Sequence, residues 1–330
     1  MENGIETALA AAIAAGESVR GTTSPNPPVG AAILDRQGNL VGTGATEPAG
    51  GPHAEIVALR EAGEKAEGGT AVVTLEPCNH IGRTGPCSEA LVAAGVEFVY
   101  YCHPDPNPEA GGGADHLRRQ GVGVERIERD VDTLRPWLTA VRRNRPHVTL
   151  KFAQTLDGFT AALDGTSRWI TGEEARRHVH HDRTKRDAVI IGTGTAIADN
   201  PSLTARDGAD DLPNQPRRVV IGGRSLTGHA RNLHHLGFEQ YRGIPEALWQ
   251  LWDSGARDVL VEGGAHLASG FVESGTVDAI QAYIAPTLLG QGRSVLTEAV
   301  GLTLADAAQF NLQNVTRLGN DVLLELTRKD

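Results

Sequence analysis

Short, mainly apolar runs alternate with amphipathic stretches in the first part of the chain. The runs are bounded by turn residues, which is typical of strands, and they lie at residues 29–34, 39–44, 70–75, 97–102 and 121–127. The amphipathic stretches have helical periodicity and predict helices at residues 53–66, 88–94 and 114–120. Strands that alternate with helices predict a sheet with helices on its faces.

The alternation begins again after the basic stretch 142–146, which reads Arg-Arg-Asn-Arg-Pro. Strands are then predicted at residues 147–152, 188–191, 218–221, 259–261, 280–284 and 322–326. Helices are predicted at residues 176–185, 245–254 and 265–272. A chain of 330 residues is long enough for two domains of roughly 100–200 residues each. We therefore expect an α/β protein with one domain at 1–145 and a second at 146–330.

The composition is that of a globular protein, with 40% hydrophobic and 22% charged residues. The 31 basic residues are outnumbered by 41 acidic ones, which gives a net charge of −10. Proteins that bind nucleic acids usually carry a basic field. A small, buried substrate is therefore favoured over a nucleic acid.

Nothing in the sequence predicts a membrane span. The longest strictly apolar run covers residues 8–15, whereas a spanning helix needs about 20 residues. The acidic start of the chain favours an ordinary alanine-rich helix over a secretory signal, which begins with basic residues. We expect a cytoplasmic location and no membrane partner.

Three cysteines are too few for a disulfide framework, and an odd number cannot all be paired. Cys102 ends an apolar run and is predicted to be a packed strand residue. Cys78 and Cys87, together with His53, offer two thiolates and an imidazole, a ligand set that suits Zn²⁺ and leaves a fourth position for water. Zinc would lower the pKa of that water toward neutrality.

Glu55 lies two residues after His53, near the start of a predicted helix, so it can reach such a water without being a ligand. Zinc-dependent nucleobase deaminases have His-x-Glu followed by Pro-Cys-x-x-Cys, with the glutamate as general acid and base. Here the second cysteine lies nine positions after the first. Two alternatives remain: a structural zinc site, which would need a fourth protein ligand and no Glu55, and a nucleic-acid cytidine or adenosine deaminase.

Three segments together resemble the bifunctional riboflavin biosynthesis deaminase/reductases. They are Pro-Asn-Pro-Pro-Val-Gly at 25–30, Pro-His-Ala-Glu at 52–55, and Glu-Pro-Cys-Asn-His through Gly-Arg-Thr-Gly-Pro-Cys at 76–87. The resemblance implies a cytidine-deaminase-like N-terminal domain. Its implied reaction is the hydrolytic deamination of 2,5-diamino-6-(5-phosphoribosylamino)pyrimidin-4(3H)-one. The implied substrate contacts are Asn26, His80 and Arg83, with Arg83 as a cation for the phosphate.

Later segments resemble the reductase domain of the same family, which has a dihydrofolate-reductase-like fold. They lie at residues 151–158, 167–171 and 192–206. A dinucleotide-binding Gly-x-Gly-x-x-Gly motif is not present, because residue 197 is isoleucine. The resemblance implies hydride transfer from NADPH to C1′ of the ribosyl group, which opens the sugar to a ribityl chain.

The same resemblance implies roles for single residues of the second half. The implied cofactor contacts are Ala153, Trp169, Thr195 and Asp199. The implied substrate contacts are Ser167, Arg183, Leu203 and Arg206. Lys151 and Asp157 are expected near the reacting carbon, as catalytic residues.

Residues 261–265 read as a strand, a glycine-rich turn and the start of a helix. Backbone N–H groups at such a helix N-terminus suit a phosphate. Together with the resemblance, this arrangement makes Glu262 a candidate substrate contact and Gly264 a candidate cofactor contact.

The sequence departs from the family pattern at a few positions. Gly222 and Gly223 stand where the family commonly has Asp and a small polar residue, and Thr46 stands where it often has His. The glycines at 222 and 223 keep open an inactive or altered reductase domain, whereas Thr46 bears only on the phosphate contacts of the deaminase half. The preference for NADPH over NADH and the expected homo-oligomer rest on the resemblance alone. His178, His180 and His181 are predicted to lie on a solvated helix face.

Overall fold

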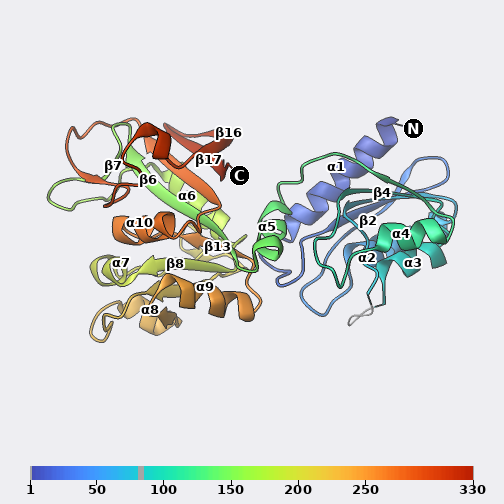
Figure 1. Cartoon of the computed structure of the whole chain (residues 1–330), viewed down its shortest axis with the longest axis horizontal. Helices are drawn as coiled ribbons and strands as arrows, with labels where there is room; N and C mark the ends of the chain where they lie inside the picture. Colours follow the sequence, from blue (N-terminus) through green and yellow to red (C-terminus); the bar gives the residue numbers. More distant parts are fainter. Residues whose placement is uncertain (1, 81–84, 330) are drawn as a thin grey trace. The chain divides into compact units, whose positions relative to one another are not determined.

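The computed structural model describes residues 2–80 and 85–329 and divides the chain into two compact units, 1–144 and 145–330 (Figure 1). Each unit is built around one main sheet with helices on both faces. None of the helices in the described ranges is long and apolar enough to cross a membrane.

The first unit has a five-stranded sheet in the order β2-β1-β3-β4-β5. Its strands are β1 (Gly30–Leu34), β2 (Leu40–Ala45), β3 (Thr70–Leu75), β4 (Phe98–His103) and β5 (Gly123–Arg126). β1 pairs antiparallel with both β2 and β3, whereas β3, β4 and β5 are parallel. Strands β1 and β3 are almost wholly buried, as expected for central strands covered on both faces.

The helices of this unit are α1 (Glu2–Ser18), α2 (Ala54–Ala62), α3 (Cys87–Ala93), α4 (Gly113–Arg119) and α5 (Arg135–Arg143). A Cβ atom at Gly30 would collide with the backbone of Ala12 in α1, and one at Gly44 would collide with the backbone of Ala54 in α2. Gly44 pairs with Ala31, the neighbour of Gly30. Successive strand residues point to opposite faces, so α1 and α2 cover opposite faces of the sheet at very short range.

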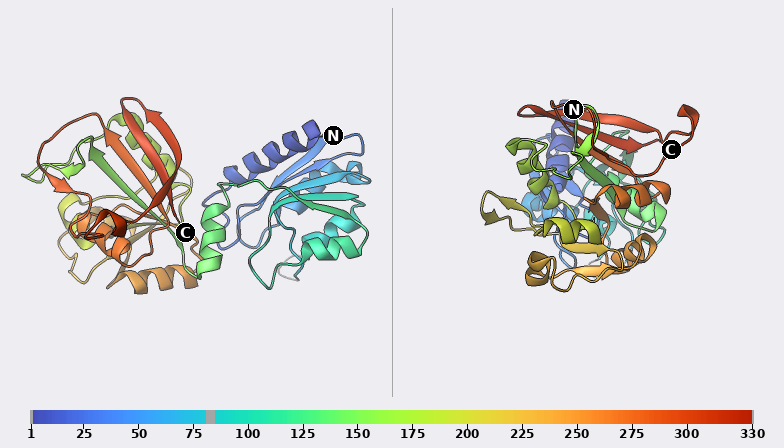
Figure 2. Two further views of the ribbon diagram at one scale, coloured as in Figure 1. Left: turned by 45° about the horizontal axis from the view of Figure 1, so that its top comes forward. Right: turned by 90° about the vertical axis from the view of Figure 1, so that its left-hand side faces the viewer.

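The second unit has an eight-stranded sheet in the order β12-β11-β8-β13-β6-β14-β17-β16. Its strands are β6 (His147–Thr155), β8 (Ala188–Gly192), β11 (Arg217–Ile221), β12 (Glu239–Tyr241), β13 (Asp258–Val261), β14 (Ala279–Ala285), β16 (Phe310–Leu318) and β17 (Asp321–Arg328). The strands are parallel from β12 to β14, and β17 and β16 then run antiparallel. Figure 2 shows these last two strands in red beside β14.

The helices of the second unit are α6 (Glu173–Arg183), α7 (Thr193–Asp199), α8 (Arg231–Leu236), α9 (Ile244–Asp253) and α10 (Ala265–Glu273). Four short strands lie outside the main sheet: β7 (Phe159–Ala161) pairs with β15 (Arg293–Ser294), and β9 (Arg206–Asp207) pairs with β10 (Asp210–Asp211).

The two faces of the large sheet differ in chemistry because alternate strand residues differ. One face is apolar: Val148, Val259 and Ile190 pack there with residues of α9 and α10. The other face also has an apolar cluster, which includes Val189 and Leu260, but beneath α6 the strands β6 and β13 place the polar residues Thr149 and Asp258 there.

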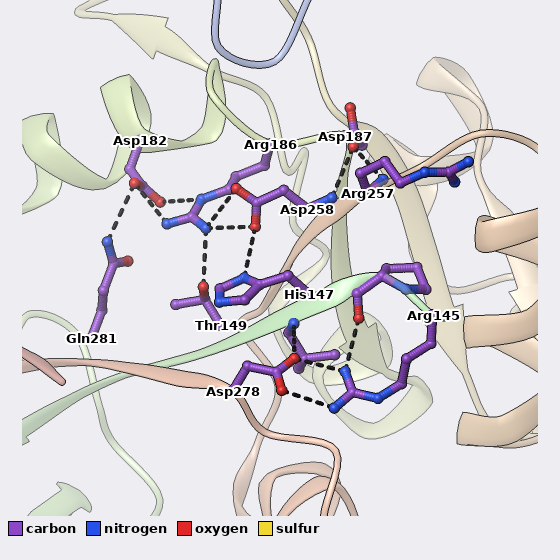
Figure 3. A network of polar contacts seen from close by, with 12 residues as sticks. Arg145, His147, Thr149, Asp182, Arg186, Asp187, Arg257, Asp258, Asp278 and Gln281 are labelled. Carbon is purple, nitrogen blue, oxygen red and sulfur yellow. Dashed lines mark hydrogen bonds and ion pairs between the residues drawn. The ribbon is translucent and has the colours of Figure 1, made fainter. Parts of the chain in front are cut away.

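A buried ionic network ties the end of α6 to this polar face (Figure 3). The Arg186 guanidinium donates hydrogen bonds to Asp182 at 2.9 Å, to Asp258 at 2.9 Å and to the Thr149 hydroxyl at 3.0 Å. Burial disfavours the Arg186 charge, but Asp182 and Asp258 outweigh it and raise the pKa of the guanidinium. Buried charges of this kind persist only when they are paired.

Candidate functional site

The three predicted metal ligands converge in the first unit. His53 immediately precedes α2, Cys78 follows β3, and Cys87 begins α3. His53 Nδ1 lies 3.5 Å from Cys78 Sγ and 3.4 Å from Cys87 Sγ, and all three ligand atoms lie within 4.8 Å of one another. Both cysteines are buried.

This donor set fits a zinc ion. Two sulfurs and one imidazole nitrogen are one of the three-ligand sets that hold catalytic zinc and leave a fourth position open. Metal binding needs thiolates. Hydrogen bonding from Cys87, opposed by burial and assisted by His53, lowers the pKa of the Cys78 thiol to about 4. Cys87, which shares that proton, has its pKa raised. The convergence agrees with the sequence-based zinc motif.

Glu55 lies in the first turn of α2, and its side chain is buried. Burial, with a contribution from the charge of Cys78, raises the pKa of the carboxyl group to about 7. The group also interacts with Cys87 and His53. A carboxyl group with a pKa near the working pH can both accept and return a proton, as a general acid and base must.

Two residues to which the sequence motifs give no role, Glu76 and Gly113, connect the segment before Cys78 to α4. Glu76 accepts hydrogen bonds from the backbone N–H groups of Ala114 at 3.0 Å and Asp105 at 3.3 Å, so it joins the end of β3 to the start of α4. Gly113 packs so closely on the Pro77 carbonyl that any Cβ would collide with it. Glycine at the start of α4 is therefore required by the packing beside Cys78.

The predicted substrate residues of this half differ in how the structure places them. Asn26 is half-buried in a turn that its backbone closes by donating a hydrogen bond to the Thr23 carbonyl at 2.9 Å. His80 Nδ1 is buried and has no hydrogen-bond partner among the described residues. Arg83 lies outside the described residues. Thr46 is buried, and its hydroxyl accepts a hydrogen bond from Val29 N–H at 3.2 Å.

A second polar cluster forms on the α6 face of the large sheet. Glu262, directly after β13, accepts a bidentate pair of hydrogen bonds from Arg183 of α6, with Nε–Oε1 at 2.7 Å and Nη2–Oε2 at 3.0 Å. Lys151 of β6 places Nζ 3.6 Å from Glu262 Oε2. Burial opposes ionisation of Glu262, but Arg183 and Lys151 outweigh it and lower the pKa of the carboxyl from its ordinary 4.5 to about 2.

The lowered pKa predicts a pH-dependent contribution of Glu262 to stability. A carboxyl whose pKa is lower in the folded chain stabilises it above the unfolded-state pKa, and this gain is lost as the pH falls through the folded-state value. We expect E262Q to be less stable than the wild type at neutral pH, with the difference shrinking between pH 4.5 and about 2. Urea unfolding across that range measures it, with exposed Glu273→Gln as the control. A difference that stays constant with pH would contradict the assignment.

Leu203 and Arg206 lie on the segment 203–206, which is hydrogen-bonded to α6. The Thr204 carbonyl accepts a hydrogen bond from Arg183 Nη1 at 2.7 Å, and Leu203 is buried with a φ of 54°. Arg206 is exposed at the end of this segment. Ser167 is also exposed, on the loop that precedes α6.

Asp157 is held by its own surroundings. Its carboxylate accepts hydrogen bonds from Gly290 N–H at 2.6 Å, Leu289 N–H at 3.0 Å and the Thr155 hydroxyl at 2.6 Å. These bonds, the one from Thr155 foremost, lower the pKa of the carboxyl. The carboxylate therefore ties the end of β6 to the loop at 287–290.

Two of the predicted cofactor residues, Thr195 and Gly264, lie just beyond the carboxyl ends of β8 and β13. The Thr195 hydroxyl accepts a hydrogen bond from Gly264 N–H at 3.1 Å, so α7 and the start of α10 lie side by side. Trp169 is 68% exposed, and the Arg176 guanidinium lies 4.5 Å from its ring centre. The Asp199 carbonyl accepts a hydrogen bond from Arg168 at 3.1 Å. Ala153 is half-buried on β6.

The backbone conformation and the packing at position 222 explain why glycine stands there. Its φ is 130°, and a Cβ there would lie 2.7 Å from the Thr193 hydroxyl. Thr193 begins α7 and accepts a hydrogen bond from Arg224 Nε at 3.2 Å. In this chain the position next to the cofactor candidates therefore accommodates only glycine without a shift of Thr193.

The histidines of α6 do not form the solvated face that the sequence suggests. His178 is half-buried, and its Nδ1 lies 2.8 Å from the hydroxyl of the buried Tyr283. His180 is half-buried and lies 2.9 Å from the Thr204 carbonyl. The prediction was wrong for these two because it judged the helix by its charge rather than by the strands beneath it.

Comparisons with known proteins match both halves of the chain. Residues 3–103 match the family described as the cytidine and deoxycytidylate deaminase zinc-binding region, and residues 146–324 match the RibD C-terminal domain. The riboflavin biosynthesis protein RibD of Corynebacterium ammoniagenes is 60% identical over 312 residues, which are 92% of each chain. RibD of Mycobacterium tuberculosis is 45% identical over 98% of each chain.

Solved structures give the same picture. RibD of Acinetobacter baumannii matches with a TM-score of 0.88 and 38% identity over 99% of each chain. A diaminohydroxyphosphoribosylaminopyrimidine deaminase/5-amino-6-(5-phosphoribosylamino)uracil reductase of Thermotoga maritima matches with a TM-score of 0.87 and 30% identity over 99% of each chain.

Proposed function

The chain belongs to the RibD family of bifunctional riboflavin biosynthesis deaminase/reductases, and from this membership we propose its substrates, its second cofactor and the residues of its two reactions. It is an enzyme with a cytidine-deaminase-like domain followed by a dihydrofolate-reductase-like domain. Residues 1–145 carry the deaminase in this proposal, and residues 146–330 carry the reductase. The match over both halves decides against a nucleic-acid deaminase, which has no use for the second half.

The deaminase half acts on 2,5-diamino-6-(5-phosphoribosylamino)pyrimidin-4(3H)-one. Zinc held by His53, Cys78 and Cys87 would supply a water that is acidic enough to attack at neutral pH. Glu55 accepts a proton from the attacking water and delivers it to the amino group, which leaves the pyrimidine carbon as ammonia. The convergence of these three ligands beside a buried glutamate of raised pKa is the observation that carries this half.

Substrate recognition in this half falls to Asn26, His80 and Arg83. The buried Nδ1 of His80, which lacks a partner in the described part of the chain, supports a role for this side chain in contacting the substrate. Arg83 is proposed to bind the phosphate.

The reductase half takes the deaminated product. A bound nicotinamide cofactor, which we propose to be NADPH, would supply the hydride. The side chains and backbone proposed to hold it are Ala153, Trp169, Thr195, Asp199 and Gly264. The N-terminus of α10, which follows Gly264, supports this placement because backbone N–H groups at a helix N-terminus favour phosphate groups.

The substrate of this half is proposed to contact Ser167, Arg183, Leu203, Arg206 and Glu262. The reduction adds a hydride to C1′ and a proton to the ring oxygen that leaves it. We assign that proton transfer to Lys151, and its ammonium group, which lies 3.6 Å from Glu262, supports a place beside the substrate contacts. Asp157 is proposed to lie near the reacting carbon as well. Its carboxylate accepts hydrogen bonds from Leu289 and Gly290, which hold the loop that follows β14.

Product mass tests the proposal directly. The purified protein is loaded with zinc and incubated with the diaminopyrimidinone ribosylamine phosphate, with and without NADPH. We expect exchange of an NH group for oxygen without NADPH and the gain of two further hydrogens with it. Exchange alone would show an inactive or altered reductase, and no exchange would overturn the substrate assignment. A cytoplasmic location and association into a homo-oligomer stay predictions.

A further inference from the structure

His180 is a side chain of α6 to which neither reaction assigns a task. Its imidazole lies between two parts of the segment that follows α7. Nδ1 is 2.9 Å from the Thr204 carbonyl oxygen, and Nε2 is 3.3 Å from Arg206 Nε. The ring is therefore engaged at both nitrogens.

The two contacts determine the tautomer of His180. A carbonyl oxygen only accepts hydrogen bonds, so Nδ1 carries the hydrogen. In the neutral ring Nε2 then offers a lone pair, which is what the Nε–H group of Arg206 requires. Burial and the charges of Arg183 and Arg206 lower the pKa of His180, although the Thr204 carbonyl and Glu262 act in the opposite direction. The neutral form, which can accept from Arg206, is thus the favoured one.

The backbone beside Arg206 is held independently of His180. Arg183 donates to the same Thr204 carbonyl at 2.7 Å. Gln215 donates to the Ala205 carbonyl at 2.6 Å and accepts from Ala205 N–H at 2.9 Å. The Arg206 side chain, by contrast, is exposed, and among the described residues the structure shows one hydrogen bond from its guanidinium, the bond to His180.

We propose that His180 is a positioning residue of the reductase site, which orients the Arg206 guanidinium toward the phosphate of the substrate. Holding Nε leaves the two terminal nitrogens of Arg206 to form paired hydrogen bonds with phosphate oxygens, the geometry in which arginine recognises phosphate. A long, exposed side chain loses rotamer entropy when it binds. His180 removes part of that cost before the substrate arrives. The inference rests on the proposed contact between Arg206 and the substrate.

Steady-state kinetics of the full-length enzyme test this role, with 5-amino-6-(5-phosphoribosylamino)uracil and NADPH as substrates. H180F keeps a planar ring but removes both hydrogen bonds. We expect its KM for the pyrimidine to rise about tenfold, the effect of one lost hydrogen bond to a charged group. The kcat and the KM for NADPH should stay unchanged, because an orienting contact acts equally on the bound substrate and the transition state.

Two further variants separate the two nitrogens of the ring. In H180N the side-chain amide lies where Nδ1 of the histidine ring was. In H180Q the longer side chain places its amide where Nε2 was. H180Q should therefore keep an acceptor for Arg206 and a KM close to the wild-type value, whereas H180N should behave like H180F. A merely structural role would predict the reverse order or no difference, together with a lowered melting temperature.

The double variant H180F/R206A completes the test. We expect R206A to raise KM, and H180F to add nothing in its presence, because a positioning residue acts through its partner. Full additivity, or an unchanged KM in H180F while R206A raises it, would overturn the role of His180 alone. An unchanged KM in R206A would overturn the proposed substrate contact of Arg206, and the role of His180 with it.

Discussion

Replacing Glu55 with glutamine will abolish deamination and leave reduction intact. Glutamine has nearly the same shape but cannot take up a proton, so water cannot be activated and the amino group cannot leave as ammonia. Loss of a general acid and base typically costs about 10²–10⁴ in rate. Glu55 is buried, and its pKa is raised to about 7, which matches the proton affinity to both steps. We therefore expect the kcat of deamination to fall by at least about 10².

The controls separate chemistry from folding and from metal binding. E55Q should retain one zinc per chain by metal analysis, because Glu55 is not among the ligands that converge in the structure. It should also reduce pre-deaminated substrate at the wild-type rate, because reduction is proposed for the second half. Glu61→Gln makes the same chemical change on the same helix at an exposed position that contacts Thr43, and it should be silent. Loss of both activities in a folded, zinc-loaded E55Q would refute the assignment of two separate sites.

The zinc site was predictable because each of its residues sits in a short local pattern. His53 and Glu55 are two positions apart on one helix start, and each cysteine borders a regular element. The motif therefore gives both the residue types and their orientation. The motif does not predict the contacts that hold these residues in place, because a contact such as that of Gly113 with Pro77 joins segments far apart in the chain.

The second site was not predictable in the same way. Glu262, Arg183 and Lys151 come from three segments, and no local pattern links them. They meet because β13 and β6 are neighbouring parallel strands and α6 lies across them. The family resemblance is what implied roles for these residues. Local sequence patterns predicted only the glycine-rich turn after β13.

Strands with a buried apolar run were found most readily. β3 was predicted at its observed bounds, because all but the first of its residues are buried. β16 was missed: it lies at the edge of the sheet and is largely exposed, so it shows neither an apolar run nor a clear alternation. Its strand conformation comes from pairing with β17, which is information from elsewhere in the chain.

The ionic network of Arg186 will show the largest effect on stability. In R186M the carboxylates of Asp182 and Asp258 stay buried without their guanidinium partner (Figure 3). Removing one partner of a buried ion pair typically costs about 3–5 kcal/mol. We expect a loss of this size in urea unfolding of the second unit, followed by reductase activity and by tryptophan fluorescence. R177M, in the exposed pair with Glu173 on the same helix, should cost at most about 0.5 kcal/mol.

A triple variant distinguishes buried charge from lost packing as the cause. D182N/R186M/D258N removes the charge of both carboxylates together with that of the arginine. Because replacing a whole buried ionic group is far less costly than breaking it, the triple variant should recover part of the stability that R186M loses. That recovery would be a coupling between contacting residues, which simple addition of three losses cannot produce. If R186M were instead no less stable than R177M, α6 would be held by its apolar contacts with Tyr283 and Leu323, and the ionic network would serve another purpose than anchoring the helix.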